Sequence, residues 1–124
     1  MIHELIGLHG HLVDEGDFDR LGELFARDVV YDLRDYGGGE LHGIDAIVRA
    51  SRALGDANPV GHHVTNIVIE AYDGDVARII SKGIGIRIDG SCGSVLYRDE
   101  VRKEANGWRI ARRRVSPRKQ PLSP

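Results

Sequence analysis

Three tight-turn signals divide the second half of the chain into strand-like segments. The dipeptides Asp73-Gly74, Asp89-Gly90 and Asn106-Gly107 carry the residues that two-residue β-hairpin turns require. The segments around them, 63–71, 76–88, 95–104 and 108–115, contain many β-branched and aromatic residues, as strands do. Consecutive hairpins of this kind predict a long antiparallel meander.

The first half of the chain has helical periodicity instead. Apolar residues recur every three or four positions from Ile2 to Val13, which predicts a helix that Gly16 ends. Asp17 is a suitable N-cap for a second helix, with Leu21, Leu24 and Phe25 on its apolar face. A short strand is expected over 29–33 and a third helix over 44–54.

The glycines at 37–39 raise the question of an anion-binding loop. A phosphate cradle needs a helix that begins directly after the glycines, and here residues 40–43 intervene. A flexible loop is therefore the preferred interpretation.

The resulting order of elements is α-α-β-α-β-β-β-β, which is typical of an α+β fold. A long twisted meander curls, so three N-terminal helices are expected to cover the concave face of a curved, mostly antiparallel sheet. The two layers are expected to enclose a cavity at their wide end, where a ligand would bind.

Composition excludes several other classes of protein. The chain has 124 residues, enough for one domain, and a net charge of −2, so no basic field attracts nucleic acid or anionic lipid. No apolar run is long enough to span a membrane, and residues 1–4 show no signal-peptide pattern. Cys92 is the only cysteine and no internal disulfide can form, so a cytoplasmic location is the default expectation.

Several segments together resemble the SnoaL-like branch of the nuclear transport factor 2-like superfamily. They are residues 14–31, which include Asp14-Glu15-Gly16-Asp17-Phe18, then 63–66 with 74–77, and finally Gly107-Trp108-Arg109-Ile110 with Arg113. The resemblance covers residues 1–116 as a single domain and leaves 117–124 as a loose C-terminal tail. The branch includes scytalone dehydratases, bile-acid 7α-dehydratases, dehydrochlorinases and polyketide cyclases.

The resemblance implies a catalytic pair of Asp14 and His63. A neutral imidazole can remove a proton beside a carbonyl, and a carboxylate on its other nitrogen fixes the tautomer and stabilises the imidazolium. The implied function is a cofactor-independent lyase or isomerase that acts on a small, mostly apolar oxygenated substrate. The resemblance further implies no metal, no organic cofactor, and a homodimer formed through the outer face of the sheet.

Two features keep this assignment of the pair open. On an ideal helical wheel, Asp14 lies roughly 140° from the centre of the apolar face, so it reaches a cavity only where the helix tilts or ends; otherwise it belongs to the turn. His62 would replace His63 after a one-residue slip of the strand, because neighbouring strand residues face opposite sides.

Further candidates for substrate binding are Arg113, His9, Tyr31, Asn66 and Tyr97. Alternation directs at least one of the three arginines at 112–114 inward; Arg113 matches the family position and has either an anionic ligand or a structural ion pair as partner. His9 is either a core residue or a polar group on the cavity wall. Asn66 and Tyr97 either donate hydrogen bonds to a substrate oxygen or are structural.

The sequence departs from scytalone dehydratases at two positions. Ser81 and Leu33 stand where those enzymes have a second His and a Tyr, although Tyr31 shares the strand face of Leu33. Both departures argue against that particular reaction.

Two other functions compete with the lyase or isomerase. A non-catalytic ligand carrier or dimeric interaction module needs a cavity but no aligned pair. An epoxide hydrolase would need several acids in the cavity, and the sequence offers few candidates beside Asp14 and Asp32. His3, His9 and His11 have helical spacing but no clustered acidic ligand, so they make a weak case for a metal site.

Overall fold

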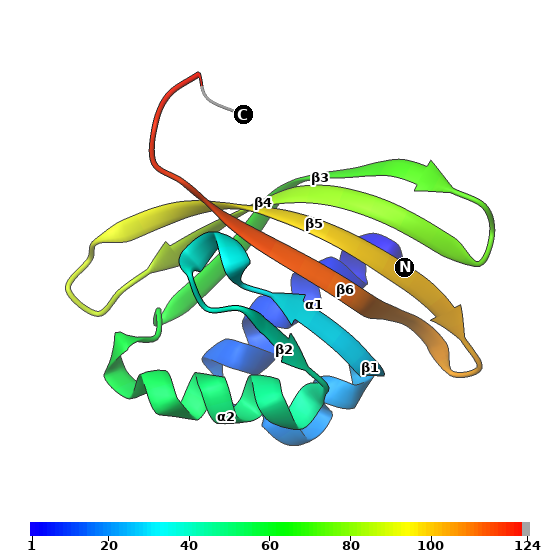
Figure 1. Cartoon of the computed structure of the whole chain (residues 1–124), viewed down its shortest axis with the longest axis horizontal. Helices are drawn as coiled ribbons and strands as arrows, with labels where there is room; N and C mark the ends of the chain where they lie inside the picture. Colours follow the sequence, from blue (N-terminus) through cyan, green and yellow to red (C-terminus); the bar gives the residue numbers. More distant parts are fainter. Residues whose placement is uncertain (123–124) are drawn as a thin grey trace.

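The structure is a computed structural model that describes residues 1–122. Helices lie below one curved sheet (Figure 1). The chain begins with α1 (Ile2–Asp14) and the 3₁₀ helix η1 (Phe18–Glu23), followed by β1 (Phe25–Asp32) and η2 (Arg34–Tyr36). β2 (Glu40–His42), α2 (Ile44–Leu54) and η3 (Gly55–Ala57) come next.

Four long strands complete the sheet: β3 (Gly61–Tyr72), β4 (Val76–Ile86), β5 (Cys92–Glu104) and β6 (Gly107–Arg118). The strand order is β2-β1-β6-β5-β4-β3, and among these six strands β1 and β6 alone pair in parallel. The predicted α+β class and the predicted meander of four consecutive strands are thus confirmed.

Several elements differ from the prediction. The first strand, expected over 29–33, already begins at Phe25, a residue expected on the apolar face of the second helix. The second helix is a 3₁₀ helix, and Asp17 makes no side-chain capping bond there, although Leu21 and Leu24 are fully buried. Glu40–His42, expected as a connection, forms edge strand β2 against the end of β1. The last strand runs to Arg118 rather than ending near residue 115, because its residues 116–118 still pair with the start of β5.

The core lies where α1 crosses the sheet. Ile6 and Leu12 of α1 are 1% and 2% exposed and belong to one apolar cluster with Phe25, Val101 and Ile110 of the sheet. Burying a side chain of this size contributes roughly 1.5–3 kcal/mol. This packing fixes the end of α1, where Asp14 lies, relative to β3.

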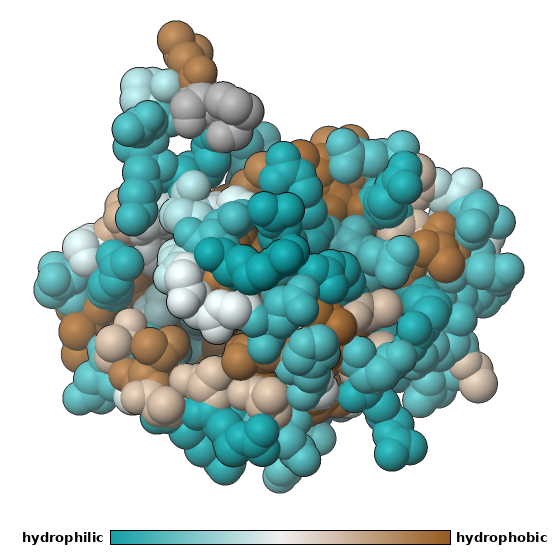
Figure 2. Space-filling model, in the orientation of Figure 1, coloured by the Kyte–Doolittle hydropathy of each residue, from teal (hydrophilic) through white to brown (hydrophobic). Residues whose placement is uncertain are grey.

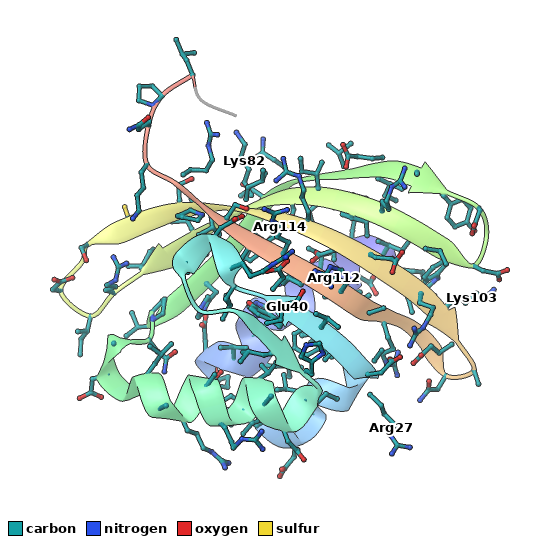
Figure 3. All side chains as sticks on the ribbon, in the orientation of Figure 1. Arg27, Glu40, Lys82, Lys103, Arg112 and Arg114 are labelled. Atoms are coloured by element: carbon teal, nitrogen blue, oxygen red, sulfur yellow. The ribbon has the colours of Figure 1, made fainter. Side chains whose placement is uncertain are left out.

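The outer face of the sheet carries ion pairs instead of core residues. Arg112 of β6 donates hydrogen bonds to Asp32 and Glu40, and Arg114 pairs with Asp35; Figure 3 labels Arg112, Arg114 and Glu40 beside one another. Alternation along β6 therefore leaves Arg113 on the concave face. None of the helices in residues 1–122 is long and apolar enough to cross a membrane.

Candidate functional site

A pocket of about 500 Å³ lies between the concave face of the sheet and α2. Figure 2 shows apolar residues gathered between α2 and the sheet, with hydrophilic ones around them. The volume of the pocket falls within the range of small-molecule sites, roughly 300–1,000 Å³. The apolar part of its lining includes Val13, Leu33, Leu41, Ile47, Leu54 and Val95.

His62 and Asp14 form a hydrogen-bonded pair at the wall of this pocket. The distance from His62 Nδ1 to Asp14 Oδ1 is 2.6 Å, and the backbone N–H of His62 also donates to the same carboxylate at 3.0 and 3.2 Å. The side chains are 19% and 24% exposed. His62 lines the pocket, whereas Asp14 lies behind it. Asp14 reaches this position because α1 ends there.

The expected partner of Asp14, His63, lies elsewhere. Its side chain is exposed on the other face of β3, and His62 takes its place at the carboxylate. The reason is a β-bulge between Thr65 and Val68, where Asn66 has a φ of +55°. Ile67 packs on the core, so regular alternation along β3 would direct His63, four residues earlier, to the same inner face. The bulge adds one residue between them, which reverses the alternation and directs His62 inward instead.

The hydrogen bonds to Asp14 determine the tautomer of His62. A carboxylate only accepts, so Nδ1 carries the proton. Nε2 then has a free lone pair, on a ring that lines the pocket. This is the arrangement in which an imidazole acts as a general base with an oriented, charge-stabilising carboxylate behind it.

A glycine allows α1 to approach β3 closely. A Cβ atom at Gly10 would overlap the carbonyl oxygen of His62. Gly10 is itself buried. The absence of a side chain there is therefore what lets the backbone of β3 come near enough for His62 to reach Asp14.

His9, one turn before Val13, lies between the core and the pocket. It is 7% exposed, and its ring makes edge contacts with the rings of His62, Phe25 and Tyr97 at 5.7–6.2 Å between centroids. Burial holds the pKa of His9 well below its usual value, and the electrostatic effects of Arg113 and His62 act in the same direction. His9 is therefore a neutral polar group on the wall.

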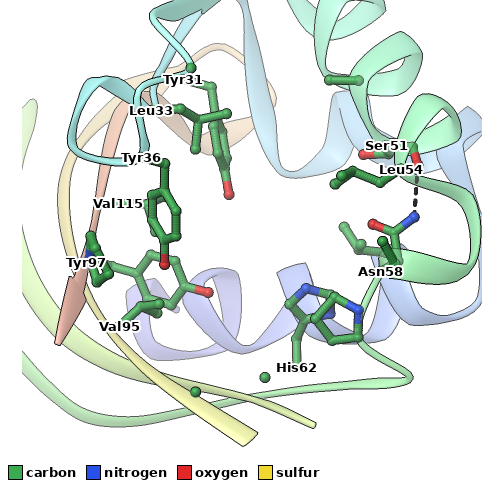
Figure 4. A pocket seen from close by; sticks show the side chains of 18 of the residues that line it. Tyr31, Leu33, Tyr36, Ser51, Leu54, Asn58, His62, Val95, Tyr97 and Val115 are labelled. Atoms are coloured by element: carbon green, nitrogen blue, oxygen red, sulfur yellow. Dashed lines mark hydrogen bonds between the residues drawn. The ribbon is translucent and has the colours of Figure 1, made fainter. Parts of the chain in front are cut away.

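Three tyrosines form the opposite side of the pocket. Tyr31 of β1, Tyr36 of η2 and Tyr97 of β5 direct their hydroxyls into it, facing His62 (Figure 4). Burial raises the pKa of all three phenols, although the guanidinium of Arg113 opposes this for Tyr31 and Tyr97. The hydroxyls consequently stay protonated and can donate hydrogen bonds.

Arg113 lies behind this tyrosine wall. It is 1% exposed and makes a two-bond pair with Asp99, both bonds 2.8 Å long. Its guanidinium carbon lies 4.2 Å from the centre of the Tyr97 ring. Burial would lower the pKa of Arg113, but Asp99 outweighs it and the pKa rises. Arg113 is therefore held by the structural ion pair that the sequence left open.

A small second cavity of about 10 Å³ is lined by Arg113, His9, His62 and Tyr97, among other residues. One guanidinium nitrogen of Arg113, Nη1, is buried without a hydrogen-bond partner. A space of this size is close to that of one water molecule.

Two other sequence candidates lie away from the pocket. Asn66 is exposed at the bulge of β3. Asp32 is fully buried on the outer side of the sheet beneath Arg34 and Arg112; hydrogen bonds from Arg34 hold the pKa of its carboxyl well below the usual range. Asp32 is thus wrong as an inward-facing acid, because β1 directs Tyr31 inward and its neighbour outward.

Two residues of the site are not among the candidates from the sequence. Asp99 lies two positions after Tyr97 and therefore on the same strand face, which was the available signal for a partner of Arg113. Tyr36 had no such signal, since it depends on the short helix η2. Within residues 1–122, no three His, Cys, Asp or Glu side chains gather closely enough to hold a metal ion.

Known structures share this architecture. A Novosphingobium aromaticivorans protein described as a candidate aromatic ring hydroxylase is 28% identical, with a TM-score of 0.79 over 99% of this chain and 87% of that one. An NTF2-like protein with a cystatin-like fold from that organism is also 28% identical, with a TM-score of 0.78 over 98% and 82%. A candidate scytalone dehydratase from Novosphingobium aromaticivorans, 22% identical, has the same fold, with a TM-score of 0.76 over 95% of this chain and 82% of that one.

No curated protein sequence matches the chain closely enough to count as a relative. The family model of the SnoaL-like domain, in contrast, matches residues 1–114. That match covers α1 and the whole sheet except the last residues of β6, including both members of the His62–Asp14 pair. The chain therefore belongs to the SnoaL-like domain family.

Proposed function

We propose that this protein is a cofactor-independent lyase or isomerase in which His62, oriented by Asp14, transfers a proton of a small, mostly apolar oxygenated substrate. The observation that carries the proposal is the 2.6 Å contact between His62 Nδ1 and Asp14 Oδ1 at the wall of an apolar pocket. The family includes dehydratases and isomerases, and the same pair of groups serves both reactions.

The chemistry would begin at Nε2 of His62. For a dehydration, Nε2 takes the proton from the carbon beside a carbonyl, and the C–H electrons move toward the carbonyl oxygen. The imidazolium, stabilised by Asp14, then returns that proton to the departing β-hydroxyl, so that one C–O bond breaks, one C=C bond forms and water leaves. For an isomerisation, the proton returns to a different carbon of the same substrate.

The negative charge that develops on the carbonyl oxygen needs hydrogen-bond donors opposite the base. The hydroxyls of Tyr31 and Tyr97 meet that need, because both are protonated and both line the pocket. The buried charge of Arg113 behind Tyr97 strengthens them as donors without touching the substrate. His9, being neutral, does not compete with His62 for the proton.

The rival functions find less support. Among the described residues that line the pocket, none is acidic, whereas an epoxide hydrolase needs carboxylates that activate water. A ligand carrier needs no oriented histidine, so the carrier function does not account for the short contact between His62 and Asp14. The carrier is therefore an outcome to be distinguished by experiment.

The test uses 5-nitrobenzisoxazole, an apolar compound whose ring opens when a base removes one C–H proton. The N–O bond breaks, and a coloured nitrophenolate with a nitrile forms, so no native substrate is required. We expect the protein to exceed an equal concentration of free imidazole. We expect His62→Ala to lower kcat/KM by roughly 100-fold and His63→Ala to leave it within about two-fold.

Two results would contradict the proposal. One is an equal loss of activity in the His62 and His63 variants, which would indicate a nonspecific surface base. The other is no proton transfer by a folded wild-type protein that still binds apolar ligands, in which case the pocket is that of a carrier.

A further inference from the structure

The Lys, Arg, Asp and Glu side chains that line the pocket are of one charge sign. Of the described residues that line it, three are basic, namely Arg87, Arg118 and Lys119, while none is acidic. The protein as a whole has a net charge of −2, so a wholly positive lining is not an average of the surface. The rest of the lining is apolar, aromatic or neutral and polar.

The three basic residues lie at one end of the pocket because of the strand register. Arg87 follows directly after β4, whose last residue Ile86 pairs with Cys92, and Arg118 ends β6 opposite Ser94. Both partners belong to the first three residues of β5, so the two arginines flank the same short stretch of strand. Lys119 continues from Arg118 and is exposed.

The charge of Arg87 acts toward the interior of the pocket. Burial raises the pKa of the Tyr36 phenol, and the Arg87 guanidinium opposes that rise from across the rim. One nitrogen of Arg87, Nη1, donates a long hydrogen bond of 3.4 Å to the hydroxyl of Ser91. Its guanidinium is therefore only partly engaged by its own hairpin.

The acids near this end do not line the pocket. Asp89, in the hairpin after Arg87, accepts the backbone N–H of Ser91. Hydrogen bonding with Ser91 lowers the pKa of its carboxyl and the charge of Arg87 helps to lower it, but Asp89 is not among the lining residues. Asp35, on the opposite side, is taken up by Arg114 and Ser116. Arg87 and Lys119 thus border an apolar interior, which is the arrangement that an amphiphilic anion would complement.

We infer that the ligand of this pocket carries an anionic group, which lies at the rim against Arg87 and Lys119 while its apolar body extends inward toward His62. A carboxylate is the simplest such group, and Arg can bind it with two parallel hydrogen bonds. That this ligand is also the substrate rests on the proposed function. If so, the substrate class narrows to apolar oxygenated acids, whose charged end lies far from the carbon that loses its proton.

The geometry gives the anionic group a positioning role. An anion held at the rim orients the apolar body lengthwise between α2 and the sheet, so the reacting carbon meets Nε2 of His62. It also keeps a charge out of the apolar interior, where an unpaired ion would be costly. A neutral ligand of the same shape would lack this anchor and bind in several orientations.

The test compares 2-naphthylacetate with its uncharged isostere, 2-naphthylacetamide, by calorimetric titration at pH about 8.5, where free imidazoles are neutral. Partly exposed ion pairs are individually weak, so we expect the acetate to bind roughly five- to ten-fold more tightly at low salt. Added salt should narrow that ratio. The variant Arg87→Gln/Lys119→Gln should bring it close to one.

The matched control removes the same charge from the outer face. Lys82 and Arg98 are exposed, and alternation along β4 and β5 directs them away from the pocket; Figure 3 labels Lys82 above the sheet. The variant Lys82→Gln/Arg98→Gln should retain the preference for the acetate. A ratio near one in the wild type, or a preference that survives in Arg87→Gln/Lys119→Gln, would overturn the inference.

A further variant separates this inference from the proposed function. His62→Ala lacks the base but keeps the rim, so it should retain the preference for the acetate while it loses proton transfer to 5-nitrobenzisoxazole. If the wild type transfers the proton but binds the acetate and the acetamide equally well, the inference of an anionic substrate is wrong and the proposed lyase or isomerase function is unaffected.

Discussion

The carboxylate of Asp14 receives both the ring Nδ1–H and the backbone N–H of His62. The two donors constrain the residue differently, since the ring contact sets the tautomer and the backbone contact anchors the start of β3. Replacing Asp14 should therefore affect proton transfer strongly, because it disturbs both the tautomer and the position of His62.

We therefore predict that Asp14→Asn lowers kcat/KM for 5-nitrobenzisoxazole by about 100-fold or more. An amide can present its NH₂ to Nδ1, which would move the ring proton to Nε2 and remove the base. The tautomer is measured by ¹⁵N NMR of the imidazole, and Glu15→Gln, at the exposed neighbour of Asp14, serves as the control. Full activity in Asp14→Asn would exclude the carboxylate from the mechanism.

A second residue-scale prediction concerns the buried pair of Arg113 and Asp99. Removing one partner of such a pair leaves an uncompensated charge and costs roughly 3–5 kcal/mol, whereas replacing both with apolar residues is often close to neutral. We expect Arg113→Met to be strongly destabilised in urea and Arg113→Met/Asp99→Leu to recover most of the loss. A double variant less stable than Arg113→Met would show that Asp99 has a partner besides Arg113.

Single residues also mark how far the sequence leads. The sequence indicates Asp14, His9, Tyr31 and Tyr97 as candidates, and in the structure Asp14 pairs with His62 while the other three line the pocket. His62 is only the alternative to its neighbour, because the resemblance implies His63 and a bulge that reverses the strand alternation leaves no mark in the sequence. Bulges depend on local pairing between strands, which a single sequence does not contain.

Among the elements, α1 and β3 together create the candidate active site. They approach closely at Gly10, where a side chain would meet the backbone of His62 rather than a movable side chain. Gly7, one turn earlier in the same helix, faces open space. The two glycines thus differ in environment while sharing a helix, which makes them a matched pair.

We predict opposite effects of alanine at these two positions. Gly7→Ala should raise the free energy of unfolding by about 0.5–1 kcal/mol, because alanine loses less backbone entropy in a helix. Gly10→Ala should lower it by roughly 1–3 kcal/mol, since overpacking must push the strand away, and should also reduce proton transfer by separating His62 from Asp14. Equal stability of the two variants in urea would contradict the close approach.

Elements differ in how well local patterns announce them. The hairpins of β3 to β6 could be predicted because their turns contain Asp-Gly and Asn-Gly, which specify the connection by themselves. β2 could not, because its three residues are polar at both ends and gain their strand geometry only from pairing with β1. The second helix is a 3₁₀ helix for a similar reason. Its geometry depends on the burial of Leu21 and Leu24 in the core, and no side-chain capping bond fixes its start.

On the scale of the whole molecule, ionisable groups are divided between the two faces of the sheet. The outer face holds carboxylates whose pKa values are lowered by hydrogen bonds from arginines, among them Asp32, Asp35 and Glu40. The concave side holds His9, whose pKa is lowered by burial. Acid should therefore weaken the fold in two separate pH ranges, each belonging to one face.

The sign follows from which state binds more protons. A carboxyl whose folded pKa is depressed contributes stability that is present above its unfolded pKa, about 4, and is lost as pH falls further. His9 is neutral in the folded protein, while an unfolded histidine binds a proton below about pH 6.5. Stability linked to His9 is therefore complete above that pH and declines as pH falls toward the folded pKa.

We predict that the free energy of unfolding falls between pH 7.5 and 5 with a contribution from His9 of up to about 1.4 kcal/mol per pH unit. His9→Leu should remove that contribution and flatten the curve in this range, while leaving the steeper loss below pH about 4 unchanged. His11→Gln, on the exposed side of α1, is the control and should follow the wild type. Parallel curves for His9→Leu and the wild type in urea titrations would mean that His9 gains its proton inside the folded protein, and a neutral wall beside His62 would then be wrong.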